Sequence, residues 1–138
     1  LDALTDVRRS AHRIAGEMER VEEARSEAPE AVTRARSGVR AVARVADAVR
    51  SEVASDKLPA GAGQQGLDDL RQRAERALRV AEEAASVLVS ATLAEVADAA
   101  LMRLRDAANA AESAGTAAST LLDTLRADVD RARLEAVD

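Results

Sequence analysis

An apolar heptad repeat that keeps its phase on both sides of a proline is the feature that most constrains this fold. With Leu4 at an a position, apolar side chains recur at a and d through residue 53, and only Arg25 breaks the pattern with a charge. The members are Leu4, Ala11, Met18, Arg25, Val32, Val39, Ala46 and Val53 at a, and Val7, Ile14, Val21, Ala28, Ala35, Val42 and Val49 at d. Pro29 lies inside the repeat. Because two helices joined by a loop have no reason to share one phase, the pattern predicts a single helix over 1–56, kinked at Pro29.

The composition favours long helices over a thick globular core. The 138 residues include no Phe, Trp or Tyr, and about a quarter of them are Ala. Aromatic side chains normally supply much of a core, about 150–250 Å² each, whereas Ala is the strongest helix former and is small. The charged fraction of 33% is also typical of long helices and coiled coils. We therefore expect one all-α, elongated, coiled-coil-like domain over 1–138. The chain begins with Leu rather than Met, which fits a fragment of a longer protein as well as a complete domain.

One segment, residues 57–66, has the composition of a loop. It contains Pro59 and three glycines, Gly61, Gly63 and Gly66, which disfavour helix. An a/d pattern resumes from Leu67 to Leu88, and a second register runs from Leu101 to Ala132. The sequence therefore predicts a long antiparallel helical hairpin, with one arm at 1–56 and the other at 67–138, bent near residue 92.

A second architecture fits the same pattern. Thr92 and Glu95 have the spacing of a helix-capping box, and Gly115 lies in a Ser-Ala-Gly-Thr stretch that could end a helix. Breaks near Thr92 or Gly115 would give a single-chain bundle of three or four helices. The shared phase of Ala108, Gly115 and Leu122 favours a continuous helix there, in which the glycine allows close helix approach.

The hairpin would leave part of its apolar surface uncovered. Two arms cannot enclose all of the aliphatic side chains that widen the a/d face, namely Val45, Val49, Leu78, Leu88, Leu101 and Leu104. These residues are the expected interface, and the expected partner is protein: a second copy that completes a four-helix bundle, or other helices.

Arg36, Arg40 and Arg44 form a basic patch on the first arm. It could bind an anion such as a phosphate, but the hairpin places Arg40 and Arg44 near Glu82 and Glu83, which favours an ion-paired face. The net charge of −5 and the lack of aromatic stacking groups argue against nucleic acid and make a membrane surface an unfavourable partner. Arg25, at an a position, either specifies register or extends its charge to solvent.

Nothing in the sequence points to catalysis. His12 is the only histidine and falls on the solvent side of the repeat, and there is no cysteine to help bind zinc. We expect no enzyme activity, no cofactor and no metal, and a slight preference for a soluble, cytoplasmic location. The expected function is a structural or interaction module, a helical rod or scaffold that mediates self-association or protein contacts. The alternatives are a helical signalling or sensor bundle and, less favoured, an amphipathic protein that binds lipid surfaces.

Overall fold

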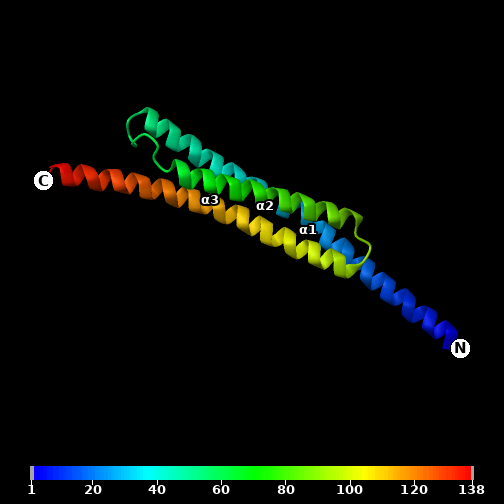
Figure 1. Cartoon of the computed structure of the whole chain (residues 1–138). Coiled ribbons are helices and arrows are strands. Elements are labelled where there is room, and N and C mark those ends of the chain that lie inside the picture. The colour runs from blue at the N-terminus through cyan, green and yellow to red at the C-terminus, as the bar shows by residue number, and fades with distance from the viewer. Residues whose placement is uncertain (1, 138) are drawn as a thin grey trace.

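The computed structural model describes residues 2–137 and consists of three helices over that range, α1 (Asp2–Ala54), α2 (Gln64–Ser90) and α3 (Ala94–Val137). The chain reverses at both connections, so α2 runs antiparallel to α1, and α3 runs parallel to α1 (Figure 1). The all-α class is confirmed. The structure has the three-helix form with a break near Thr92, so the second arm expected as one helix over 67–138 is two helices instead.

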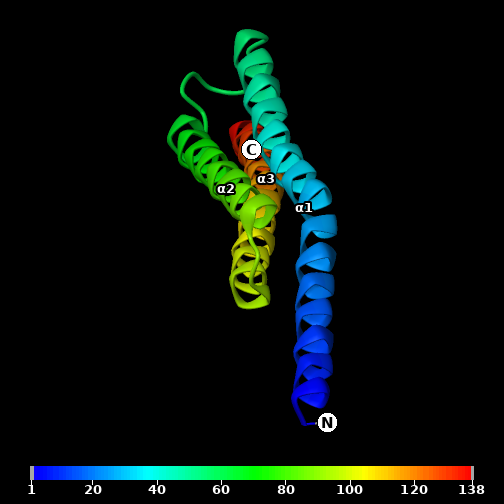
Figure 2. The same cartoon turned by 90° about the vertical axis from the view of Figure 1, so that its right-hand side faces the viewer.

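Helix α1 continues through Pro29, as the unbroken repeat predicted. Proline has no N–H to donate, and its ring clashes with the carbonyl four residues earlier, so a helix bends where it contains one. Figure 2 shows α1 changing direction between its blue and cyan parts, the region that contains Pro29. The 53 residues of α1 give a helix about 80 Å long.

The break between α2 and α3 is a short extended turn. Ala91 has φ −68° and ψ 135°, and its N–H donates to the carbonyl of Leu88. If α2 continued with the same register, Glu95 and Asp98 would lie on the apolar seam, and burying their charges would be costly. The reversal of the chain avoids this cost. No break occurs at Gly115, which lies inside α3.

The first connection is anchored where it leaves α1. The N–H groups of Lys57 and Leu58 donate to the carbonyl of Glu52 at 2.8 and 3.2 Å, and Asp56 adopts the left-handed conformation (φ 59°) that ends a helix. The Leu58 side chain is buried. This tight loop aligns α1 and α2 differently from the hairpin estimate, and it brings Arg25 beside the end of α2.

The core is a narrow seam between the three helices and is built mainly from alanine. Its largest fully buried side chains are Leu88, Leu104 and Val42. Eight alanines have no exposed surface: Ala35, Ala74, Ala81, Ala84, Ala97, Ala108, Ala111 and Ala118. Side chains this small bury little area each, so the helices must lie close together over a long distance.

Helices α1 and α3 come into backbone contact at Gly38. A Cβ placed on Gly38 would lie 2.3 Å from the carbonyl oxygen of Ala111, and one on Gly115 would lie 2.9 Å from the Cβ of Ala41. The expectation that Gly115 allows close approach is therefore confirmed, and Gly38 is its counterpart on α1.

A ladder of ion pairs runs along the same two helices. Arg20 pairs with Asp98, Glu27 with Arg105, and Arg34 with Glu112, so each step is seven residues and each pair spans 78 residues of sequence. Because the signs alternate along each helix, a shift of one heptad would place like charges together. Exposed pairs contribute only about 0–1 kcal/mol each, so their main effect is to select this parallel alignment.

We predict that Gly38→Ala destabilises the bundle. The added methyl would overlap the Ala111 carbonyl, and overpacking of this kind costs about 1–3 kcal/mol, more than the roughly 1 kcal/mol gained from helix propensity. Urea unfolding followed by circular dichroism should show a lower free energy of unfolding.

Gly16→Ala is the matched control, because a Cβ at Gly16 meets nothing within 4 Å. It should raise stability, or leave it unchanged if this end of α1 frays before the bundle unfolds. Equal stabilisation by both substitutions would contradict the backbone contact at Gly38.

Candidate functional site

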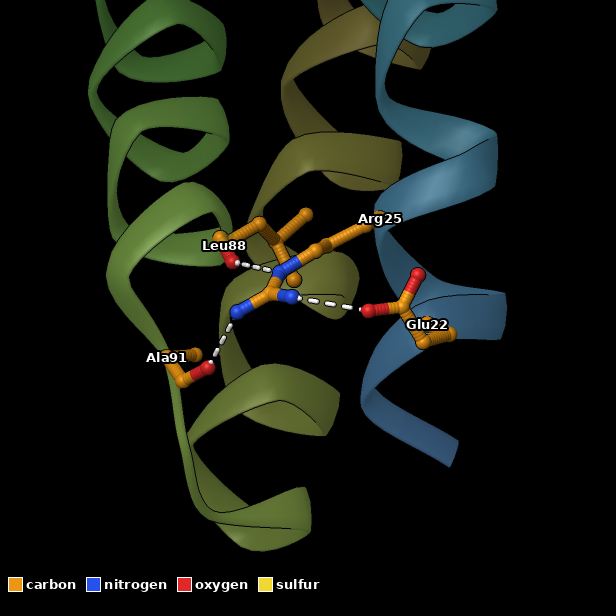
Figure 3. A network of polar contacts seen from close by, with 4 residues as sticks. All are labelled: Glu22, Arg25, Leu88 and Ala91. Atoms are coloured by element: carbon orange, nitrogen blue, oxygen red, sulfur yellow. Dashed lines mark hydrogen bonds and ion pairs between the residues drawn. The ribbon is translucent and has the colours of Figure 1, made fainter. Parts of the chain in front are cut away.

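Side chains of α1 hold the turn between α2 and α3. Arg25 donates from Nε to the carbonyl of Leu88 at 2.8 Å and from Nη2 to the carbonyl of Ala91 at 2.6 Å. Its Nη1 donates to Oε1 of Glu22 at 3.0 Å, which orients the guanidinium (Figure 3). Arg25 therefore bridges α1 and the end of α2, a role that neither interpretation of its a position included.

The C-terminus of α2 explains why a cation is needed there. The last carbonyls of a helix have no intrahelical partner and carry the negative end of the helix dipole. The last turn of α2 has no basic residue of its own. Arg25 supplies both the missing donors and the positive charge, from a different helix.

The N-terminus of α3 is capped by a negative charge from α1. Oε1 of Glu17 accepts a hydrogen bond from the N–H of Ala94 at 3.1 Å. A carboxylate at this position satisfies a free N–H and faces the positive end of the dipole. The capping role expected for Thr92 is thus taken by Glu17, and α1 stabilises both helix ends at the turn.

Beyond this turn α1 continues without a neighbour (Figures 1 and 2). Since α3 begins opposite Glu17, the segment 2–16 projects past the bundle. The a and d side chains of this segment, together with Met18 next to it, form what we call the N-terminal stripe: Leu4, Val7, Ala11, Ile14 and Met18. The four larger members are 54%, 64%, 58% and 60% exposed. These are the same heptad positions that are covered farther along α1.

Other exposed aliphatic side chains lie near the same end. They come from the last turn of α2, the turn after it and the first three turns of α3: Val87, Val89, Leu93, Val96 and Met102. Among the described residues, only Leu134 and Val137 are large exposed hydrophobics at the opposite end. The exposed apolar surface is therefore concentrated where α1 leaves the bundle.

The structure places the six expected interface residues within the chain's own core. Val45, Val49, Leu88 and Leu104 are buried, and Leu78 and Leu101 are half-buried against the same core. The reversal at Ala91 lays α3 over the surface that two arms would have left open. No second copy is needed to cover these side chains.

The expected basic patch is exposed, and it does not form the ion pairs expected with Glu82 and Glu83. Arg36, Arg40 and Arg44 lie on the outer side of α1, and in the described range 2–137 no hydrogen bond or ion pair joins them to Glu82 or Glu83. Their neighbour Arg34 instead pairs with Glu112 at 2.7 Å. The shifted alignment of α2 accounts for the lost pairing.

Two ion pairs lower the pKa of their acids. Hydrogen bonds from Arg34 lower the pKa of Glu112 below its ordinary value, and hydrogen bonds from Arg126 do the same to the pKa of Glu52. The two helices α1 and α3 are joined by both pairs. They are structural contacts on the outside of the bundle.

We predict that acid weakens the α1–α3 contact through these carboxylates. Because the folded pKa is lowered, the contribution is complete above the ordinary glutamate pKa of about 4.3 and is lost as the pH falls through the folded value. Glu112→Gln should make stability fall less between about pH 5 and pH 3, measured by urea unfolding. Glu82→Gln, which removes an exposed carboxylate without an arginine partner, is the control, and equal slopes in the wild type and both variants would contradict this assignment.

We also predict that Arg25→Met loosens the turn. The substitution keeps the aliphatic stem but removes two hydrogen bonds to helix-end carbonyls, so the free energy of unfolding should fall by about 1–2 kcal/mol. Hydrogen exchange should accelerate first at residues 86–92. Arg40→Met is the control, and a similar loss of stability in that variant would show that any arginine on α1 has this effect.

His12 is exposed on the projecting segment. Over residues 2–137, no group of three His, Cys, Asp or Glu side chains is placed to hold a metal ion, and none of the helices there has the length and apolarity to cross a membrane.

No family model, curated protein or solved structure matches this chain.

Proposed function

We propose that the chain is a non-enzymatic helical rod that presents the N-terminal stripe for contact with other protein helices. The observation that carries the proposal is the continuation of the covered α1 seam into a segment where its large side chains are more than half exposed. Soluble proteins rarely leave a contiguous apolar surface open unless something binds it.

The rest of the structure supports a role in presentation. Arg25 and Glu17 attach α1 to the end of the bundle, next to the Met18 end of the stripe. The ion-pair ladder begins at Arg20 and fixes the same part of α1 to α3. The projecting segment is thus the extension of a supported helix, which lowers the entropy that a partner must remove on binding.

The spacing of the stripe also suits packing against another helix. Its a/d spacing gives a narrow seam suited to one partner helix. A lipid surface is a poorer fit, because interfacial helices favour aromatic side chains and the chain has none.

Site-specific photo-crosslinking in the source cells tests this function. A benzoylphenylalanine at Ile14 should give light-dependent protein adducts of the natural full-length protein. The control position is Leu134, which is similarly exposed (71% against 58%) but lies at the other end of the rod. Val7→Asp should remove the adducts at Ile14 while circular dichroism stays unchanged.

Absence of adducts at Ile14, or equal adducts at Leu134, would contradict the proposal. The experiment does not depend on which protein is captured.

A further inference from the structure

We infer that a groove between α2 and α3 binds an acidic helix of a partner protein. The groove has a volume of about 600 Å³, and its lining comes from these two helices, which lie side by side (Figures 1 and 2). We call it the α2–α3 groove. It is separate from the N-terminal stripe, so the inference goes beyond the proposed function. It follows from the charges of the groove, from their lack of partners and from the apolar surface between them.

The α2–α3 groove is basic, although the chain as a whole is acidic. Arg73 and Arg76 line it from α2, Arg103 lines it from α3, and Asp106 is the one acid of the lining. Three arginines and one aspartate give this surface a net charge of +2, whereas the whole chain carries −5. A local reversal of sign of this kind attracts an acidic ligand and orients it as it approaches.

The groove arginines lack the partners that other arginines of the chain have. Across the contact between α1 and α3, four arginines pair with a carboxylate of the opposite helix: Arg20, Arg34, Arg105 and Arg126. Within residues 2–137, Arg73 and Arg103 make no hydrogen bond or ion pair. Arg76 bonds only the carbonyl of Gln72 in its own helix, at 3.4 Å. The donors of all three guanidinium groups are therefore available to a ligand.

The arginines lie on both walls of the groove and are spread along it. Because α2 and α3 are antiparallel, Arg103 lies level with Val80 on the opposite wall, and Arg73 lies level with Ala110. Seven residues separate these two levels, which corresponds to about 10 Å along the helix axis. A helix docked along the groove would therefore meet Arg103 on one flank and Arg73 on the other. This arrangement fits a helix with acidic residues on both flanks of an apolar seam.

The floor between the arginines is apolar. Ala77 and Ala107 are buried, Val80 is half-buried and Ala110 is exposed. Side chains this small let another helix approach closely, and an amphipathic helix in an apolar groove is a common mode of peptide recognition. A phosphate ion alone would leave this floor uncovered, and a nucleic acid would find no aromatic side chain on which its bases could stack.

Fluorescence anisotropy with a designed peptide tests the chemistry of the ligand. The probe is a labelled helical peptide of about three heptads, with Leu and Ala at a and d and Glu at e and g. It should bind the purified full chain, and about 0.5 M salt should weaken the binding. The same peptide with Gln in place of Glu should bind about tenfold more weakly or worse. Equal affinity of the two peptides, or no binding of the acidic peptide at several hundred micromolar, would overturn the inference.

Two triple variants test the place of binding. The first replaces the groove arginines: Arg73→Gln, Arg76→Gln and Arg103→Gln. It should bind the acidic peptide about tenfold more weakly or worse, without loss of helix by circular dichroism. The matched control removes the same charge from the outer side of α1: Arg36→Gln, Arg40→Gln and Arg44→Gln. The control should bind like the wild type, and equal weakening in both variants would show attraction to overall charge and overturn the inference.

The N-terminal stripe supplies a further control, because an apolar seam on the peptide could also bind there. Val7→Asp should leave the affinity for the acidic peptide unchanged, and a loss of binding in this variant would place the peptide on the stripe and overturn the inference. The groove variant should still give photo-adducts at Ile14. Failure of the peptide experiments with adducts retained at Ile14 would leave the proposed function in place.

Discussion

The absence of aromatic side chains is the constraint on which the other features depend. A core of Ala, Val and Leu gains little buried area at each layer, so stability must come from many layers and from short distances between helices. This explains the long helices and the backbone contact between α1 and α3 at Gly38. It also explains why alanine occupies most of the fully buried positions. A wider side chain at these sites would separate the helices and open the narrow seam.

The reversal between α2 and α3 shows how one helix can position the ends of two others. The turn residues themselves supply little capping, since Ala91 makes only one backbone hydrogen bond and Thr92 does not bond the N–H of Ala94. Arg25 and Glu17 provide the charges that the two helix ends require, each at the end with the opposite partial charge. The turn is therefore stable only when α1 is packed against it. Folding of the turn and docking of α1 should be coupled for this reason.

Local patterns predicted the parts of the fold that depend on one helix. The repeat through Pro29, the glycine-rich connection and the close approach at Gly115 all follow from spacing along a single segment. The reversal near Thr92 was harder, because a change of register fits a bend as well as a turn, and only a contact from α1 distinguishes them. A usable signal was present in charges of opposite sign at matching heptad positions: Arg20, Glu27 and Arg34 against Asp98, Arg105 and Glu112. The capping role of Arg25 could not be derived from the sequence, because its acceptors are backbone carbonyls, which no side-chain pattern reveals.

The parallel course of α1 and α3 has a mechanical consequence. The N-terminal end of α1 and the C-terminal end of α3 leave the bundle in opposite directions (Figure 1). Tension applied between these ends would pull the two helices lengthwise past each other. Because the ion-pair ladder and the glycine contact lie in parallel along that interface, the load is shared among them and many contacts must break together. Loaded in shear rather than peeled apart, this small alanine core would resist extension better than its equilibrium stability suggests.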